Sequence, residues 1–279
     1  NRHWCRTVSV LAAKGFVGAG VSSGLKASGG LDLALIVNRG PEIAAAAVFT
    51  TNRCLANPII WSKQVIADGT ARAIILNSGG ANCYTGSQGF QTTHATAEKV
   101  AELLRDSASD VLVCSTGLIG EQLDRDKLLA GATAAHAALG VDSGESIARA
   151  IMTTDSVSKI ANFKNDDFEV SGVAKGAGML APALATMLSV VMTDAKLPEN
   201  AQEIFQRVCD RTYNRIDSDG CTSTNDTVLL MGSGASGFAP SESELESALM
   251  EICGSLSQQL IADAEGSTKT VAIEIKNAA

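Results

Sequence analysis

The sequence predicts an α+β fold in which strands form the middle layers and helices lie outside. Short β-branched or apolar runs bounded by turn residues recur along the chain, and longer segments between them carry apolar residues at helical spacing. These segments do not follow the strict strand-helix-strand order of a parallel doubly wound sheet. The 279 residues are 46% hydrophobic and 19% charged, which suits a compact protein with one large core or two smaller domains.

The strand predictions rest on runs of Val, Ile, Leu, Met and Ala that are bounded by turn residues. In chain order the expected strands are Leu31–Val37, Ala45–Thr50, Arg72–Leu76, Asp110–Cys114, Phe168–Val173, Leu188–Thr193, Thr227–Met231 and Val271–Ile275.

The helix predictions rest on apolar residues that recur every three or four positions. The expected helices are Thr93–Arg105, Glu121–Leu139, Pro198–Arg211 and Glu242–Ala264. Ser241 and Glu244 have the spacing of a capping box at the start of the last helix, where each side chain binds a free backbone N–H. Pro198 is suited to the first turn of its helix, where no N–H is needed.

Composition excludes several classes of protein. A net charge of −8 argues against a nucleic-acid partner, since phosphate binding requires a basic surface. No apolar run approaches the roughly 18–20 residues of a membrane span, and residues 1–7 do not resemble a secretory signal. The seven cysteines form an odd set without a Cys-x-x-Cys pair, so neither a disulfide framework nor a metal site is expected. Reduced thiols indicate a cytoplasmic protein.

The segment 175–188, KGAGMLAPALATML, contains the most informative pair of residues in the chain. Cleavage of the bond between Ala185 and Thr186 would give Thr186 a free α-amino group beside its own hydroxyl. An amine in that position can act as the base that activates the hydroxyl as a nucleophile. By residue type alone, Thr186 is more simply a β-branched residue at the start of a strand.

The motifs around this pair decide between the two interpretations. They are Ala13-Lys-Gly-Phe16, Gly24-Leu-Lys-Ala-Ser28, Ala46-Ala-Val-Phe-Thr50, Asn77-Ser-Gly-Gly-Ala-Asn82, Cys114-Ser-Thr-Gly-Leu-Ile-Gly120, Ile151-Met-Thr-Thr-Asp155, Thr222-Ser-Thr-Asn-Asp226 and Asp263-Ala-Glu-Gly266. In order and spacing the chain resembles the ornithine acetyltransferase family, the bifunctional glutamate N-acetyltransferases of arginine biosynthesis. Family members usually have Asn at the position of Gly80, and they continue past residue 279 through a segment that supplies substrate-binding residues.

This resemblance implies a layered fold of the N-terminal-nucleophile type, with central sheets flanked by helices, as in ornithine acetyltransferases and DmpA. It also implies that the precursor cuts itself into an α part, residues 1–185, and a β part, residues 186–279, which here is truncated at its C-terminus. The cut chains are expected to assemble as α2β2. The 279-residue form is expected to keep its fold and to bind glutamate poorly.

The implied reaction moves an acetyl group from N-acetylornithine to glutamate through an acetyl ester on Thr186. No metal and no bound cofactor are implied. Acetyl-CoA is an alternative donor in bifunctional members, and the residues leave its use open. Two rivals remain: an N-terminal-nucleophile amidase or aminopeptidase that uses water as acceptor, and a non-catalytic fragment that lacks the C-terminal segment.

The resemblance also assigns the remaining site residues. Thr116, through its hydroxyl, and Gly117, through its backbone N–H, are expected to bind the oxyanion, although a turn that enters a helix with Thr116 as its cap would explain the same residues. Lys175, Thr153 and Glu265 are expected to contact substrate, Lys175 through a carboxylate and Glu265 through an ammonium group. Thr153 and Thr154 are not distinguished, and a solvated charge is the alternative for Glu265. Lys175 precedes its glycines, which excludes a phosphate-binding P-loop.

Overall fold

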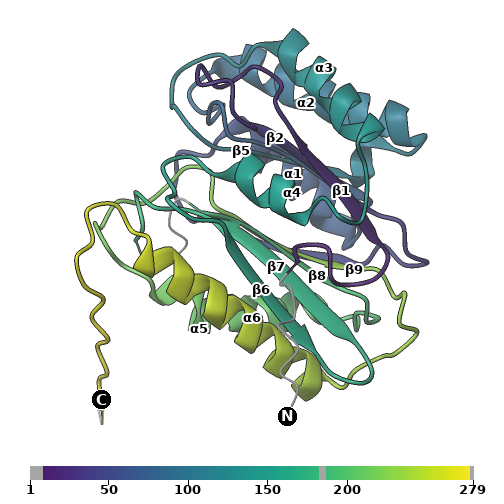
Figure 1. Cartoon of the computed structure of the whole chain (residues 1–279), viewed down its shortest axis with the longest axis vertical. Helices are drawn as coiled ribbons and strands as arrows, with labels where there is room; N and C mark the ends of the chain where they lie inside the picture. The colour runs from purple at the N-terminus through teal and green to yellow at the C-terminus, as the bar shows by residue number, and fades with distance from the viewer. Residues whose placement is uncertain (1–8, 182–186, 277–279) are drawn as a thin grey trace.

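The computed structural model describes residues 9–181 and 187–276, which form two stacked β-sheets with helices on both outer sides (Figure 1). The first sheet has the strand order β1-β2-β4-β5. Its strands are β1 (Phe16–Val21), β2 (Leu33–Asn38), β4 (Ala73–Asn77) and β5 (Val111–Ser115). β1, β2 and β4 are antiparallel neighbours, whereas β4 and β5 run parallel, so that both end at the same edge of the sheet.

The second sheet has the strand order β3-β9-β8-β7-β6. Its strands are β3 (Ala45–Phe49), β6 (Lys159–Lys164), β7 (Glu169–Lys175), β8 (Leu188–Thr193) and β9 (Thr227–Gly232). β8 and β9 are parallel, and the other pairs are antiparallel. β7 precedes the expected cut and β8 follows it, so the expected α and β parts contribute neighbouring strands to one sheet.

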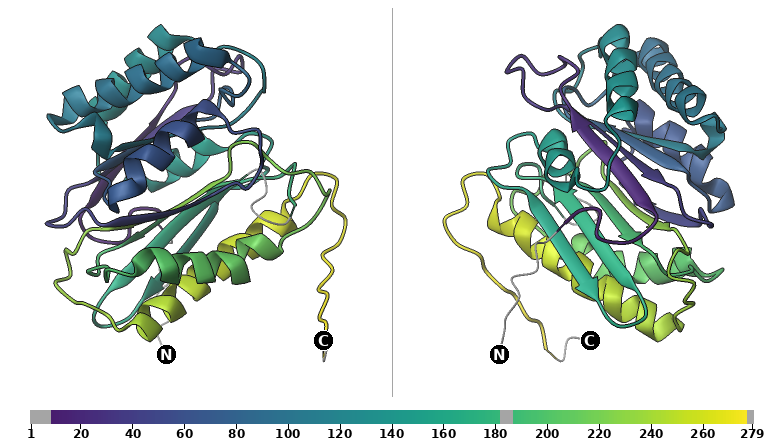
Figure 2. Two further views of the ribbon diagram at one scale, coloured as in Figure 1. Left: turned by 180° about the vertical axis from the view of Figure 1, so that it is seen from behind. Right: turned by 45° about the vertical axis from the view of Figure 1, so that its right-hand side comes forward.

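The helices form the outer layers. Figure 2 shows α2 (Gly86–Leu104) and α3 (Arg125–Ala137) on the outer face of the first sheet. α1 (Asn57–Val65) packs along the edge strand β5, whose backbone carbonyls accept hydrogen bonds from the side chains of Trp61 and Ser62. α5 (Ala201–Arg211) and α6 (Glu242–Ala262) cover the outer face of the second sheet, where they pack against β3, β6 and β7. The short α4 (Gly144–Ile151) contacts β1, β2 and β7, and it therefore lies between the sheets.

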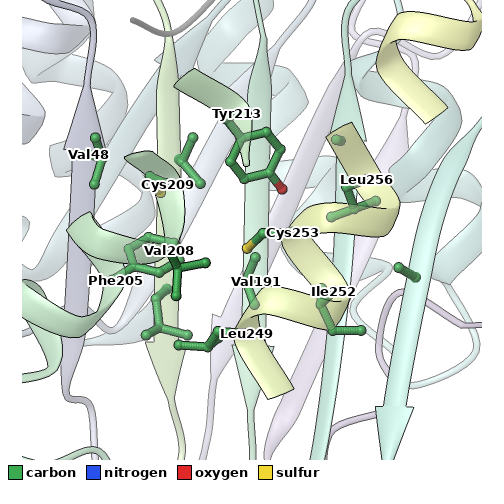
Figure 3. Close-up of a cluster of buried hydrophobic side chains, with 14 of the residues drawn as sticks. Val48, Val191, Phe205, Val208, Cys209, Tyr213, Leu249, Ile252, Cys253 and Leu256 are labelled. Atoms are coloured by element: carbon green, nitrogen blue, oxygen red, sulfur yellow. The ribbon is translucent and has the colours of Figure 1, made fainter. Parts of the chain in front are cut away.

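The alternation of side chains along the strands divides the core into layers. In β9, Leu229 and Met231 face the first sheet, whereas Val228 and Leu230 face α5 and α6. Both faces of these strands are buried, which explains their nearly continuous apolar sequences. Figure 3 shows the layer under α6, in which Phe205 and Val208 of α5 meet Leu249 and Ile252 of α6.

The structure confirms the α+β layers and the first seven predicted strands. The eighth strand, Val271–Ile275, is wrong: these residues form no strand, and the side chains of Val271, Ile273 and Ile275 are 71–85% exposed. Their alternation has the period of a strand, but none of the described strands pairs with them. An unpaired strand gains neither ladder hydrogen bonds nor burial, so the local pattern alone does not form one.

Other corrections concern ends and short elements. α2 begins at Gly86 rather than at Thr93, and α5 begins at Ala201, so Pro198 lies in the preceding turn and not in the first helical turn. β1, with its two glycines, and β6, with its two terminal lysines, were not predicted because their sequences lack a clear apolar run. The short helices α1 and α4 were missed as well. None of the described helices is both long and apolar enough to cross a membrane.

The predicted capping box is present at the start of α6. The Ser241 hydroxyl accepts a hydrogen bond from the Glu244 N–H, and the Glu244 carboxylate accepts the Ser241 N–H at 2.9 Å. Two backbone donors that the helix itself cannot satisfy are thereby bound.

Replacing the cap by Ser241→Ala should lower the free energy of unfolding by about 1 kcal/mol, because one helix N–H loses its acceptor. Ser243→Ala is the matched control, since that serine is exposed in the same first turn and lies outside the capping box, and its effect should stay within about 0.5 kcal/mol. Urea unfolding of both variants measures the difference. Equal midpoints would contradict the role of the cap.

Candidate active site

One cavity of about 720 Å³ gathers the predicted site residues that the structure describes. Thr116, Gly117, Thr153, Lys175 and Glu265 all line it, and Thr154 lines it beside Thr153. These residues come from four separate stretches of the chain, so the sequence order alone does not bring them together. Ala185 and Thr186 lie outside the described residues.

The carboxyl ends of β4 and β5 form one wall of the cavity. Thr116 directly follows β5, and its N–H donates to the carbonyl of Asn77, the last residue of β4, at 2.9 Å. Gly117 has φ +125°, and a Cβ there would lie 2.8 Å from the backbone nitrogen of Gly80. A side chain at position 117 would therefore collide with backbone, which explains the glycine. Gly80, where the resembling family usually has Asn, pairs with Thr116 in an isolated bridge.

Two hydrogen-bond donors at this wall are available to a ligand. The Thr116 hydroxyl accepts a hydrogen bond from Lys175 Nζ at 2.9 Å, so its own hydrogen is left to donate elsewhere. The Gly117 N–H has no acceptor among the described residues. The alternative role of Thr116 as a helix cap is wrong, because α3 begins at Arg125 and Asp124 caps it.

Lys175 ends β7 and is only 1% exposed. Burial lowers the pKa of its ammonium group to about 8, although the carboxylates of Asp155 and Asp226 act in the opposite direction. Its ammonium group therefore titrates near neutral pH while it contacts Thr116.

A buried ion triad holds three walls of the cavity in place. Lys159 Nζ lies 2.7 Å from Asp155 Oδ1 and 2.6 Å from Asp263 Oδ2, and the Lys159 side chain is fully buried. Asp155 also accepts the N–H groups of Thr153, at 3.0 Å, and Gly176, at 2.6 Å. Asp263 lies two residues before Glu265. The triad thus fixes the backbone beside Thr153, Lys175 and Glu265.

Burial alone would raise the pKa of Asp155. The charge of Lys175 and hydrogen bonds from Lys159, Gly176 and Thr153 outweigh burial and lower that pKa. Asp155 is therefore ionised at neutral pH.

Asp226 directly precedes β9. Leu188 of β8 pairs with both Lys175 and Thr227, so three strand ends meet at this edge. Met187, the residue after Thr186, donates its N–H to Asp226 Oδ1 at 3.0 Å. Asp226 is fully buried, burial raises its pKa well above the usual range, and its second oxygen has no partner among the described residues.

Sequence reasoning did not single out Lys26, Ser78, Asp155 or Asp226 as site residues. Lys26 and Ser78 line the same cavity, and the two aspartates position its walls. All four lie within motifs that carried the family resemblance, and that was the available signal. No group of three or more His, Cys, Asp or Glu side chains suited to a metal occurs in the described part of the chain.

Comparison with known proteins identifies the family of the chain. A model of the ArgJ family matches residues 17–279. The arginine biosynthesis bifunctional protein ArgJ of Thermobifida fusca is 55% identical over 273 residues, which are 98% of this chain and 71% of the relative. The corresponding protein of Streptomyces coelicolor is 54% identical over the same shares of the two chains.

Among solved structures, ornithine acetyltransferase from Mycobacterium tuberculosis in complex with ornithine is 52% identical, with a TM-score of 0.62 over 63% of this chain and 96% of that one. The l-aminopeptidase d-ala-esterase/amidase from Ochrobactrum anthropi, described as a variant of the Ntn hydrolase fold, is 11% identical, with a TM-score of 0.55 over 93% and 88% of the two chains. The second likeness concerns the fold alone. The predicted layered N-terminal-nucleophile fold is confirmed.

Lys159→Met should lower the free energy of unfolding by about 3–5 kcal/mol at neutral pH, because it leaves two carboxylates buried without their cation. Lys164→Met, at the other end of β6, is the matched control: its ion pair with Glu169 is exposed, and its loss should cost about 0–1 kcal/mol. Urea unfolding compares the two.

The loss in Lys159→Met should depend on pH. The folded-state pKa values of Asp155 and Asp263 are lowered, so their ionised forms stabilise the fold above the unfolded pKa of about 3.9, and this contribution disappears as the pH falls through the folded values. The difference from wild type should therefore shrink in acid. A loss in free energy of unfolding that stays constant across this pH range would mean that packing, and not charge, is responsible.

Proposed function

The chain belongs to the ArgJ family, and from this membership we propose that it is a glutamate N-acetyltransferase that takes its acetyl group from N-acetylornithine. It is an acyltransferase of arginine biosynthesis. The observation that carries the proposal is the cavity in which Thr116, Gly117, Thr153, Lys175 and Glu265 meet beside the strand that follows Thr186.

Thr186 is the proposed nucleophile, released by self-cleavage of the bond between Ala185 and Thr186. Its hydroxyl attacks the acetyl carbon of N-acetylornithine while its own α-amine takes the hydroxyl proton. The carbon–nitrogen bond then breaks, the nitrogen receives that proton, and ornithine leaves. The α-amine of glutamate next attacks the ester, which forms N-acetylglutamate and returns the proton to Thr186.

The oxyanion of each tetrahedral intermediate is assigned to the Thr116 hydroxyl and the Gly117 N–H. Both groups are free to donate into the cavity, and the Lys175 ammonium, 2.9 Å from the Thr116 oxygen, polarises that hydroxyl. Donors fixed by backbone and strand geometry need no reorganisation as the negative charge develops.

Substrate binding is assigned to three side chains of the cavity. Lys175 is suited to a carboxylate and Glu265 to an ammonium group, which together match the charges of an amino acid such as ornithine. Thr153 supplies a hydroxyl beside them, and Thr154 shares its position at the wall.

The proposal extends to assembly, donor and location. The expected α and β parts share one sheet through β7 and β8, so the cut chains would stay together by strand pairing and a common core, and α2β2 is the proposed assembly. Acetyl-CoA as a second donor fits a bifunctional family member, with no bound cofactor. A biosynthetic role and unpaired cysteines support a cytoplasmic location.

Hydrolysis is the rival reaction, because the same nucleophile with water as acceptor would make an amidase. The deciding experiment supplies N-acetylornithine with a labelled acetyl group, with and without glutamate. Label in N-acetylglutamate supports the transferase. Label found only in acetate would support the amidase instead.

Purified protein is expected to contain two chains, one of which begins with Thr186, because the hydroxyl of Thr186 can attack the carbonyl of Ala185. Thr186→Ala should remain uncut, whereas Thr186→Ser keeps a hydroxyl and should still be cut. Mass spectrometry of the intact chains measures this. A cleaved Thr186→Ala variant would overturn the assignment of the nucleophile.

Thr116→Ala should lower kcat by about 100-fold and leave KM nearly unchanged, the usual consequence of losing one oxyanion donor. Thr116→Ser keeps the hydroxyl and should retain most of the activity. Steady-state kinetics with N-acetylornithine as donor compares the two. A change confined to KM would move Thr116 from oxyanion binding to substrate binding.

A further inference from the structure

Lys26 is a second cation that lines the same cavity as Lys175. It lies in the loop between β1 and β2, is half-buried, and lines the cavity together with Thr153 and Lys175. Its Nζ donates to the carbonyl of Leu31 at 3.0 Å and to the carbonyl of Met152, the residue before Thr153, at 2.7 Å. Two of the three ammonium hydrogens are thereby fixed, and one is left for another acceptor.

The charge of Lys26 is not neutralised by a contact within the described protein. No carboxylate of the described residues forms an ion pair with Lys26 within 4.0 Å, although Asp32 and Asp155 are near enough to act on its pKa. Asp32 is occupied by the N–H groups of Ser23, Leu25 and Lys26 itself. Asp155 is held by Lys159, Thr153 and Gly176.

The two ammonium groups of the cavity act on each other. Burial is the main cause that lowers the pKa of Lys175, and the like charges of Lys159 and, to a smaller extent, Lys26 act in the same direction. Two cations close together at a partly desolvated surface repel each other, and an anion bound between them removes that repulsion. A carboxylate is the anion that both proposed substrates carry.

We propose that Lys26 binds a carboxylate of the amino-acid substrate, as a further substrate-binding residue beside Lys175. This inference deepens the proposed function and rests on it. Two sources of the carboxylate exist: the α-carboxylate, which ornithine and glutamate share, and the γ-carboxylate, which only glutamate carries. The chemistry at Lys26 is the same for both.

The test is isothermal titration of the 279-residue protein, wild type and Lys26→Met, at millimolar ligand concentrations. The ligands are glutamate, glutamine, which lacks the γ charge, glutamate α-amide, which lacks the α charge, and ornithine. Lys26→Arg keeps the charge. Lys127→Met is the matched control, because it removes a nearby exposed lysine outside the cavity. Lys26→Arg and Lys127→Met should both leave the affinities nearly unchanged.

Lys26→Met should weaken glutamate binding by about 10- to 100-fold, the scale of one charge-assisted hydrogen bond. If Lys26 binds the α-carboxylate, the substitution weakens the binding of ornithine as much as that of glutamate, and it leaves the binding of glutamate α-amide unchanged. If the γ-carboxylate is bound, glutamine and ornithine are unaffected.

Two outcomes overturn the inference while wild type still binds its substrates. In the first, Lys26→Met weakens the binding of all four ligands equally, as a general disturbance of the loop would. In the second, it weakens none of them. A wild-type protein that binds none of the ligands and transfers no acetyl group would overturn the proposed function itself, and the inference with it.

Discussion

The buried ion triad of Asp155, Lys159 and Asp263 is the interaction on which the cavity depends. Charges are costly to remove from water, and these three are tolerated because each has charged or backbone partners at hydrogen-bond distance. The triad ties the stretch after α4 to β6 and to the end of α6. Thr153, Lys175 and Glu265 are each within two residues of a group that it holds, so their positions follow from one network.

The sheet register provides the second constraint. Lys175 at the end of β7 pairs with Leu188 at the start of β8, and Leu188 pairs with Thr227 at the start of β9. Asp226 and Met187 are therefore held beside Lys175 by the backbone hydrogen bonds of these two strand pairs. The first sheet adds Thr116 and Gly117 at the ends of two parallel strands, where such ends commonly carry functional groups.

Two buried groups at this edge of the second sheet have charged forms that burial disfavours. Lys175 and Asp226 are both almost completely inaccessible to solvent. Burial lowers the pKa of Lys175 and raises that of Asp226, so that each shift favours the uncharged form. Such groups reduce the stability of the fold, and they gain most from a ligand that supplies the missing partner. The large apolar layers on both sides of the second sheet provide the stabilisation that offsets them.

Much of this protein can be read from local sequence. The apolar runs of β2, β4, β5, β8 and β9 predicted these five strands, because strands that are buried on both faces are apolar throughout. Ser241 and Glu244 predicted the start of α6, since a capping box needs only residues four positions apart or fewer. The motifs around Thr116, Lys175 and Glu265 predicted the site residues through family resemblance.

Tertiary structure decided the rest. The sequence of Val271–Ile275 alternates like a strand, yet it has no partner strand among the described residues. β1 and β6 form because neighbouring strands supply hydrogen bonds, which the sequences of β1 and β6 do not indicate by themselves. Asp155, Lys159 and Asp263 became a triad, and Lys26 became a neighbour of Lys175, only through the packing of the sheets and α6. By itself the sequence determined which segments are apolar and which residues are chemically able to act. The distances between charges more than 100 residues apart were set by the fold, because burial and long-range pairing depend on the whole chain at once.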